Sequence, residues 1–147
     1  MISEEGKVVA DRAGSVDRWK LTDVALVIKK ADLDPGEVTA RLDLQPSAVK
    51  SPGIDRWNPG GGAEGQWRYQ CDERTATDFS AQLDIVLKAA EQRSHILASL
   101  QEEGFEVFLL VGGFAAHDAR LPFSSAELQR IARLNMSLRL LPNLNER

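Results

Sequence analysis

The sequence predicts an α+β fold, a ferredoxin-like layout in which helices pack on one face of a mainly antiparallel sheet of at least four strands. Three observations support this class. Segments whose apolar residues recur with a period of two alternate along the chain with segments of helical period. Helix-start motifs stand at Asp34-Pro35 and at Ser124-Ser125-Ala126-Glu127. Residues 105–113 are nearly all apolar and end in two glycines, which is typical of a central strand.

The first predicted strand begins near Trp19 and ends near Ala31, because Val24, Leu26 and Ile28 recur at every second position. A helix of about two turns follows it. Asp34 can cap this helix, and Pro35 suits its first position. It ends before Pro46, because the residue that precedes a proline avoids the helical region.

Residues 66–71 alternate again and predict a strand with Trp67, Tyr69 and Cys71 on one face, and residues 49–52 are a candidate hairpin partner. Residues 78–103 predict the longest helix, capped by Thr77 or Asp78. Its apolar positions follow the helical period up to Gly104. They are Phe79, Leu83, Val86, Leu87, Ala90, Leu97 and Leu100.

Two elements are expected after the strand at 105–113. The capping box at Ser124 to Glu127 predicts a helix with Leu128, Ile131 and Ala132 facing inward. Asn135 suits the left-handed position after this helix. A last strand then follows from Met136 to Leu141, and Pro142 ends its pairing.

Composition limits both the organisation and the function classes. The 147 residues, of which 43% are apolar, are enough for one core, so we expect a flexible arm at 1–17, one domain at 18–142 and a polar tail at 143–147. A net charge of −4 without a basic block argues against nucleic-acid binding, and no segment has the length of a membrane helix. Cys71 is the only cysteine, which fits a cytoplasmic protein without a metal site. Nothing in the sequence indicates a cofactor.

The order of these motifs resembles a known bacterial family. The matching positions include Asp32 to Val38, Leu42-Asp43-Leu44-Gln45-Pro46 and a glycine-rich stretch before Gln66-Trp67. They continue with the long helix to Glu103-Gly104 and with Ser125-Ala126-Glu127-Leu128. Together they make the chain similar to the family catalogued as domain of unknown function 4279, from about Val24 to Leu141. The resemblance implies a fold but no catalytic residue or ligand.

The stretch RWNPGGGAEGQWR, residues 56–68, holds four of the eleven glycines and two of the three tryptophans. It lacks the Lys-Ser/Thr ending of a phosphate-binding loop, and a predicted strand follows it instead of a helix. One interpretation is a loop that only joins two strands. The other is a binding loop, in which planar cations beside aromatic rings recognise acidic or planar groups. The candidate binding residues are Arg56, Trp57, Trp67 and Arg68.

His117 and Asp118 are the candidates for an alternative pocket. They follow a predicted central strand, where a base and an orienting carboxylate could meet a substrate together with Arg56. No nucleophile or metal-ligand spacing accompanies them, so a histidine in a surface loop is the simpler interpretation. His95 lies by helical phase on the solvent side of the long helix.

The sequence therefore favours a non-enzymatic binding module that recognises another protein, with an immunity or antitoxin-like role as one form of it. This interpretation depends on a stable scaffold, the Trp/Arg loop and the lack of a convergent catalytic set. The alternative is a small-molecule-binding protein or an enzyme with a pocket between the sheet and its loops.

Overall fold

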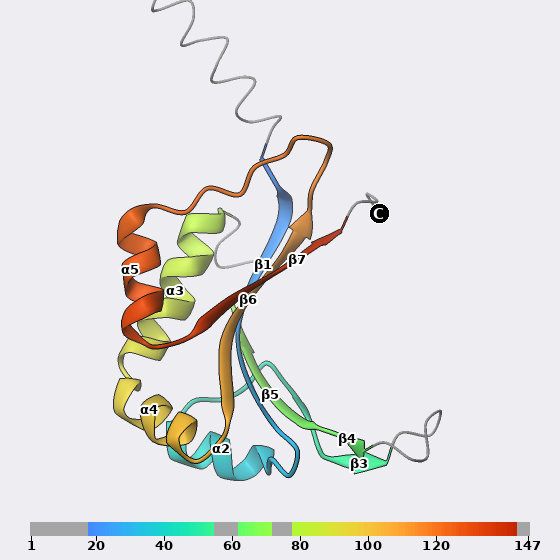
Figure 1. Ribbon diagram of the computed structural model, residues 1–147, viewed down its shortest axis with the longest axis vertical. Coiled ribbons are helices and arrows are strands. Elements are labelled where there is room, and N and C mark those ends of the chain that lie inside the picture. Colours follow the sequence, from blue (N-terminus) through green and yellow to red (C-terminus); the bar gives the residue numbers. More distant parts are fainter. Residues whose placement is uncertain (1–17, 55–61, 72–77, 144–147) are drawn as a thin grey trace, which may run out of the picture.

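A computed structural model of the protein describes residues 18–54, 62–71 and 78–143, and it places the helices of this part of the chain on one face of a five-stranded sheet (Figure 1). The strands of this sheet are β1 (Lys20–Lys30), β2 (Ala48–Lys50), β5 (Gly65–Gln70), β6 (Glu106–Phe114) and β7 (Ser137–Asn143). The helices are α2 (Pro35–Leu42), α3 (Phe79–Glu91), α4 (Ser94–Glu102) and α5 (Ser125–Arg133). A separate small sheet pairs β3 (Gly53–Ile54) with β4 (Gly62–Ala63).

The strand order β2-β5-β1-β6-β7 contains the predicted ferredoxin-like layout. Strand β1 is antiparallel to both β5 and β6, and β2 is antiparallel to β5. Each of the units β1-α2-β2 and β5-α3-α4-β6 thus joins two parallel strands that have another strand between them. Strand β7 extends this arrangement at the β6 edge, where it runs parallel to β6. The predicted α+β class, with a mainly antiparallel sheet and helices on one face, is confirmed.

The main core lies between the sheet and the helices. Val24, Leu26 and Ile28 of β1 point into it, as their alternation predicted. Trp67 of β5 is its largest fully buried side chain, with 0% of its surface exposed. Its indole Nε1 donates a hydrogen bond to Thr39 Oγ1 of α2 at 3.0 Å, so the one polar atom of this side chain is satisfied.

The helix starts that the sequence indicated are also confirmed. Asp34 accepts a hydrogen bond from the backbone N–H of Gly36 at 3.0 Å, and Asp78 accepts one from Ala81 at 3.1 Å. Ser124 and Glu127 form both hydrogen bonds of a capping box. These contacts satisfy backbone donors that have no partner within their own helices.

The single long helix predicted for residues 78–103 is wrong, because the chain leaves the helical conformation at Arg93 (φ −120°, ψ 25°) and forms α3 and α4. The Arg93 side chain turns back toward the end of α2. It donates hydrogen bonds to the carbonyl oxygens of Leu42 at 2.8 Å, Asp43 at 3.1 Å and Ala89 at 3.0 Å. One arginine therefore satisfies carbonyls at the ends of two helices and fixes their relative position.

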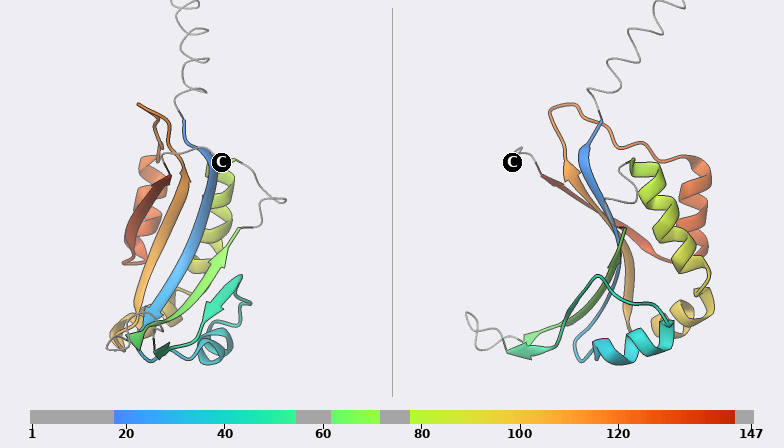
Figure 2. Two further views of the ribbon diagram at one scale, coloured as in Figure 1. Left: turned by 90° about the vertical axis from the view of Figure 1, so that its right-hand side faces the viewer. Right: turned by 180° about the vertical axis from the view of Figure 1, so that it is seen from behind.

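The predicted inward face of α5 is only partly correct. Ile131 is buried, but Ala132 is exposed and Leu128 has 46% of its surface exposed. Helix α5 connects to the edge strand β7 and lies behind it at the border of the helix layer, as the left view of Figure 2 shows. A helix at the border contacts the core along a narrow line, so fewer apolar positions are covered than a full amphipathic stripe suggests.

Arginine–carboxylate pairs connect the helices to one another. Arg130 of α5 donates to Glu91 of α3 at 2.8 and 2.9 Å and to Asp84 at 2.9 Å. Arg41 of α2 makes a two-pronged contact with Glu103, which follows α4, at 2.8 and 2.7 Å. The hydrogen bonds from Arg130 hold the pKa values of Asp84 and Glu91 below their ordinary values.

The contacts of Arg130 with Asp84 and Glu91 predict how the stability of the protein changes with pH. Because the folded pKa values of Asp84 and Glu91 are lowered, their contribution to stability is present above the unfolded pKa values and is lost as pH falls through the folded ones. At neutral pH, Arg130→Met should lower the free energy of unfolding by on the order of 1 kcal/mol. Urea unfolding of both proteins from about pH 7 to about pH 3 should show this difference shrinking with acid. A constant difference would contradict the assignment.

Gly65 occupies a position where the chain approaches itself closely. A Cβ atom at Gly65 would lie 2.6 Å from the carbonyl oxygen of Leu33 and 2.9 Å from its Cβ. At least one glycine of the glycine-rich stretch therefore has a packing role, since it lets the start of β5 lie against the turn after β1.

We expect Gly65→Ala to destabilise the protein by about 1 to 3 kcal/mol, because Leu33 or the strand has to move. Gly53→Ala is the matched control, since a Cβ at Gly53 meets nothing within 4 Å, and it should change stability by less than about 0.5 kcal/mol. Thermal or denaturant unfolding measures both variants. Equal effects of the two substitutions would argue against the close approach.

Candidate functional site

The face of the sheet opposite the helices is not covered by any helix of the described chain, and we call it the open face (Figure 2). The ends of the sheet curve toward this side: in Figure 1 and in the right-hand view of Figure 2, the C-terminal end of β7 and the β3–β4 pair both lie on the side away from the helices. The strand register assigns the side chains that belong to this face. They include Lys50, Arg68, Gln70, Asp23, Ala25, Val27, Lys29, Glu106, Phe108, Leu110, Arg139 and Leu141.

The centre of the open face is apolar and buried although no helix lies on it. Ala25, Val27 and Phe108 form a second small core there, and Leu110 packs against it. The guanidinium of Arg139 lies over the Phe108 ring at 3.7 Å from the ring centroid, and it also pairs with Glu106. The sheet therefore covers its own second core with neighbouring side chains, including a cation–π contact.

Arg68 lies beside this centre, opposite Val27 in the β1–β5 register. The side chain is half-buried, and its Nε is buried without a hydrogen-bond partner. Within the described ranges the Arg68 side chain makes no ion pair either. A buried donor left unsatisfied costs about 1 to 3 kcal/mol, so the free protein holds Arg68 in an unfavourable state that an added acceptor would relieve.

The carboxylates near Arg68 are already engaged by other groups. Asp23 accepts a hydrogen bond from Gln70 Nε2 at 2.8 Å, Glu64 stands 3.6 Å from Lys29 Nζ, and Glu106 pairs with Arg139. Lys50, which is on the strand next to Arg68, has no ion pair among the residues described. Asp23 keeps its negative charge, because the amide that donates to it is neutral, but Arg68 and Lys50 are two cations without an ion pair in the described chain. The balance of these three charges is positive, although the whole chain carries a net charge of −4.

A hollow of about 490 Å³ lies on the open face near the ends of β6 and β7, and its lining is mixed, since Asp23 and Asn143 line it beside apolar residues. Leu21 and Leu141, with 71% and 63% of their surfaces exposed, both line it, together with Phe114 and Pro142. Leu21 has a φ of 53°, next to an irregularity in the β1–β6 register. A leucine in the left-handed region is strained, and such strain is concentrated at functional positions.

The structure does not bring the four predicted binding residues together at one described site. Arg56 and Trp57 lie outside the described residues. Trp67 and Arg68 are neighbours on β5, but their side chains point to opposite faces of the sheet, with Trp67 fully buried in the main core. Trp67 has no exposed surface for a partner to contact, whereas Arg68 lies half-buried on the open face.

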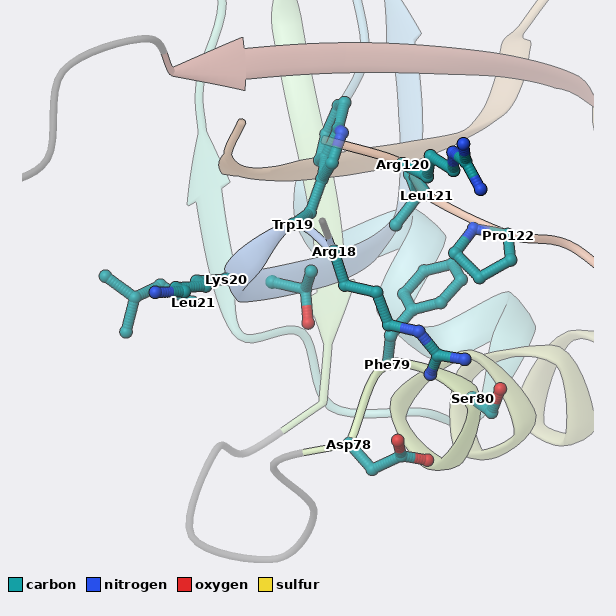
Figure 3. Close-up of a pocket in the computed structure, with 11 residues that line it drawn as sticks. Arg18, Trp19, Lys20, Leu21, Asp78, Phe79, Ser80, Arg120, Leu121 and Pro122 are labelled. Atoms are coloured by element: carbon teal, nitrogen blue, oxygen red, sulfur yellow. The ribbon is translucent and has the colours of Figure 1, made fainter. Parts of the chain in front are cut away.

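His117 and Asp118 are adjacent and highly exposed. His117 Nε2 lies 3.3 Å from Asp118 Oδ2, and their side chains are 96% and 80% exposed. Neither residue lines the hollow near the start of α3 that Figure 3 shows. Across residues 18–54, 62–71 and 78–143, no three His, Cys, Asp or Glu residues stand together as a metal site. None of the helices in these ranges could cross a bilayer.

The hollow in Figure 3 encloses about 330 Å³ between the start of β1, the N-terminus of α3 and the segment before α5. Arg18 and Arg120 contribute to it, but their guanidinium groups lie on different sides of Pro122 and do not converge. Asp78 caps α3 there, and the Thr22 hydroxyl donates to Gln82 Oε1 at 3.1 Å. This arrangement offers polar contacts but no nucleophile with a neighbouring base.

Leu21 and Leu141 were not identified from the sequence. The irregularity at residues 20–23 leaves no mark in the apolar pattern, because β1 reads as one alternating strand. Leu141, by contrast, does leave a signal in the sequence. Leu140 and Leu141 are consecutive leucines in a strand that otherwise alternates, so one of them must point away from the core.

In comparisons with known proteins, a family model described as "Domain of unknown function (DUF4279)" matches residues 19–145. The matched range includes every strand and helix described above. No curated protein and no solved structure matches the chain.

Leu21 gives a test of stored strain. Leu21→Gly should keep or raise the free energy of unfolding, by up to about 1 kcal/mol, because glycine adopts a positive φ without a steric penalty. Lys20→Gly is the control: Lys20 does not have a positive φ, and this variant should lose roughly 0.5 to 1 kcal/mol. Urea unfolding compares both variants with the wild type. A loss of stability in Leu21→Gly as large as that in the control would contradict the strain.

Proposed function

The chain belongs to the family of domain of unknown function 4279, and because this membership names no activity, we propose a function from the site: a non-enzymatic binding module that recognises another protein through the open face. The observation that carries the proposal is the hollow on the open face, which two exposed leucines, Leu21 and Leu141, line together. An immunity or antitoxin-like role is one form that this function could take.

Two properties of the hollow support protein binding. Single exposed leucines are common on protein surfaces, but here two of them line the same concavity. The hollow also adjoins a face with an aromatic residue, Phe108, and two arginines, Arg68 and Arg139. Aromatic residues and arginine are enriched at protein interfaces, whose centres are apolar and whose rims are polar.

The small-molecule or enzymatic alternative has weaker support. The hollow in Figure 3 is close to the lower limit of about 300 Å³ for ligand pockets. Its two arginines do not converge, and Asp78 presents a carboxylate in the same region. His117 and Asp118 are exposed away from it, so the candidate base and this hollow do not form one site.

The proposal predicts that Leu141→Ser abolishes partner capture without unfolding the protein. Tagged wild-type protein, Leu141→Ser and Leu128→Ser would each be used for affinity purification from the native host, followed by mass spectrometry. Leu128 is the matched control, since it is a comparably exposed leucine on α5. A protein retained by the wild type and by Leu128→Ser should be absent with Leu141→Ser, because burial of one leucine contributes about 1.5 to 3 kcal/mol.

The captured protein would then be purified, and its dissociation constant for each variant would be measured by calorimetry. We expect a weakening of about tenfold or more for Leu141→Ser alone. Equal affinity of all three proteins would place the interface elsewhere, and the lack of any specifically retained protein would count against the binding function itself.

A further inference from the structure

We propose that the partner binds as an extended segment that presents a carboxylate to Arg68 and places an apolar side chain, about six residues away, in the hollow at Leu141. This inference rests on the proposed function and adds the chemistry of the partner to it. Three features of the open face carry it: an unsatisfied donor, an excess of positive charge and the distance between Arg68 and the hollow.

The first feature is the guanidinium of Arg68. Its Nε is buried without a partner, and no other hydrogen bond or ion pair of this side chain is formed within the described chain. A carboxylate is the acceptor that best matches a guanidinium, because two parallel N–H···O bonds fit its two oxygens. A small adjustment of the side chain on binding would let Nε and one terminal nitrogen donate together.

The second feature is the charge around Arg68. Asp23, Glu64 and Glu106 are engaged by Gln70, Lys29 and Arg139, whereas Lys50 on the adjacent strand has no ion pair in the described chain. An acidic partner therefore finds uncompensated positive charge. A second copy of this chain is disfavoured, because a symmetric contact between two open faces would bring their like charges together.

The third feature is the distance between the two ends of the proposed contact. Arg68 is level with Val27 of β1, and Leu141 is level with Gly112 of β6, which pairs with Asp23. Four residues along β1 correspond to about 13 Å, and the three strand spacings from β5 to β7 correspond to about 14 Å. The diagonal is about 19 Å, which an extended chain spans with about six residues.

The path between these ends suits an extended segment. It crosses Ala25, Val27 and Phe108, which form the apolar centre of the open face and present no unpaired carboxylate. The sheet edges also curve toward this side, so a segment lying across the face would contact side chains from several strands (Figure 2). Its backbone would cross the strands diagonally and would not add to the edge of the sheet.

The test uses a random peptide library of twelve residues displayed on phage and selected on the immobilised wild-type protein. Selected peptides are synthesised, and their dissociation constants are measured for the wild type, Arg68→Gln, Leu141→Ser and Arg133→Gln. Arg133 is the matched control, since it is an exposed arginine on α5, on the helix side. Circular dichroism and urea unfolding verify that each variant is folded.

We expect the selected peptides to share an Asp or Glu and, about five to seven residues away, a large apolar side chain. Arg68→Gln should weaken their binding about tenfold or more, with a smaller loss at high salt, and Arg133→Gln should leave it unchanged. Arg68→Lys should restore only part of the affinity, because a lysine cannot form the two-pronged contact.

Two results would overturn the inference in different ways. Peptides without a common carboxylate, or peptides that bind Arg68→Gln as tightly as the wild type, would refute the acidic partner but leave the proposed function intact if Leu141→Ser still prevents binding. Selected peptides that are insensitive to both variants, or a selection without binders, would refute both.

Discussion

A sheet that carries all of its described helices on one face has to bury the centre of its other face with its own side chains. In this protein Ala25, Val27 and Phe108 meet that constraint, and the stacked guanidinium of Arg139 covers part of them. Part of the open face stays uncovered: Leu21 and Leu141 line a hollow on it, and Arg68 lies half-buried beside its centre, whereas the helix side holds the larger core.

The two faces use arginine in different ways. On the helix side Arg93 satisfies backbone carbonyls, and Arg41 and Arg130 each meet a carboxylate from another element. These side chains are fully engaged in positioning helices. On the open face Arg68 is also half-buried, but its Nε has no acceptor within the described chain. This unsatisfied donor lowers the stability of the free protein and is available to an acceptor from a partner.

Local patterns in the sequence predicted the strands, the caps and the fold class, because alternation and capping depend on neighbouring residues. The break at Arg93 could not be predicted in this way, since its cause is a contact with the carbonyls of Leu42 and Asp43, which are distant in sequence. The candidate site was found only in part. The alternation along β5 does predict that Trp67 and Arg68 point to opposite faces of the sheet. It does not predict which face lacks helices, because the packing of the whole chain decides that.

The central position of β1 has a consequence for synthesis on the ribosome. This strand is made first among those of the sheet, yet its neighbours β5 and β6 come from the middle and the last third of the chain. Its run of apolar residues, Val24 to Ile28, stays without β5 until about half of the chain has left the exit tunnel, and without β6 until about three quarters of it has. Such delayed long-range pairing slows folding and exposes a nascent chain to aggregation.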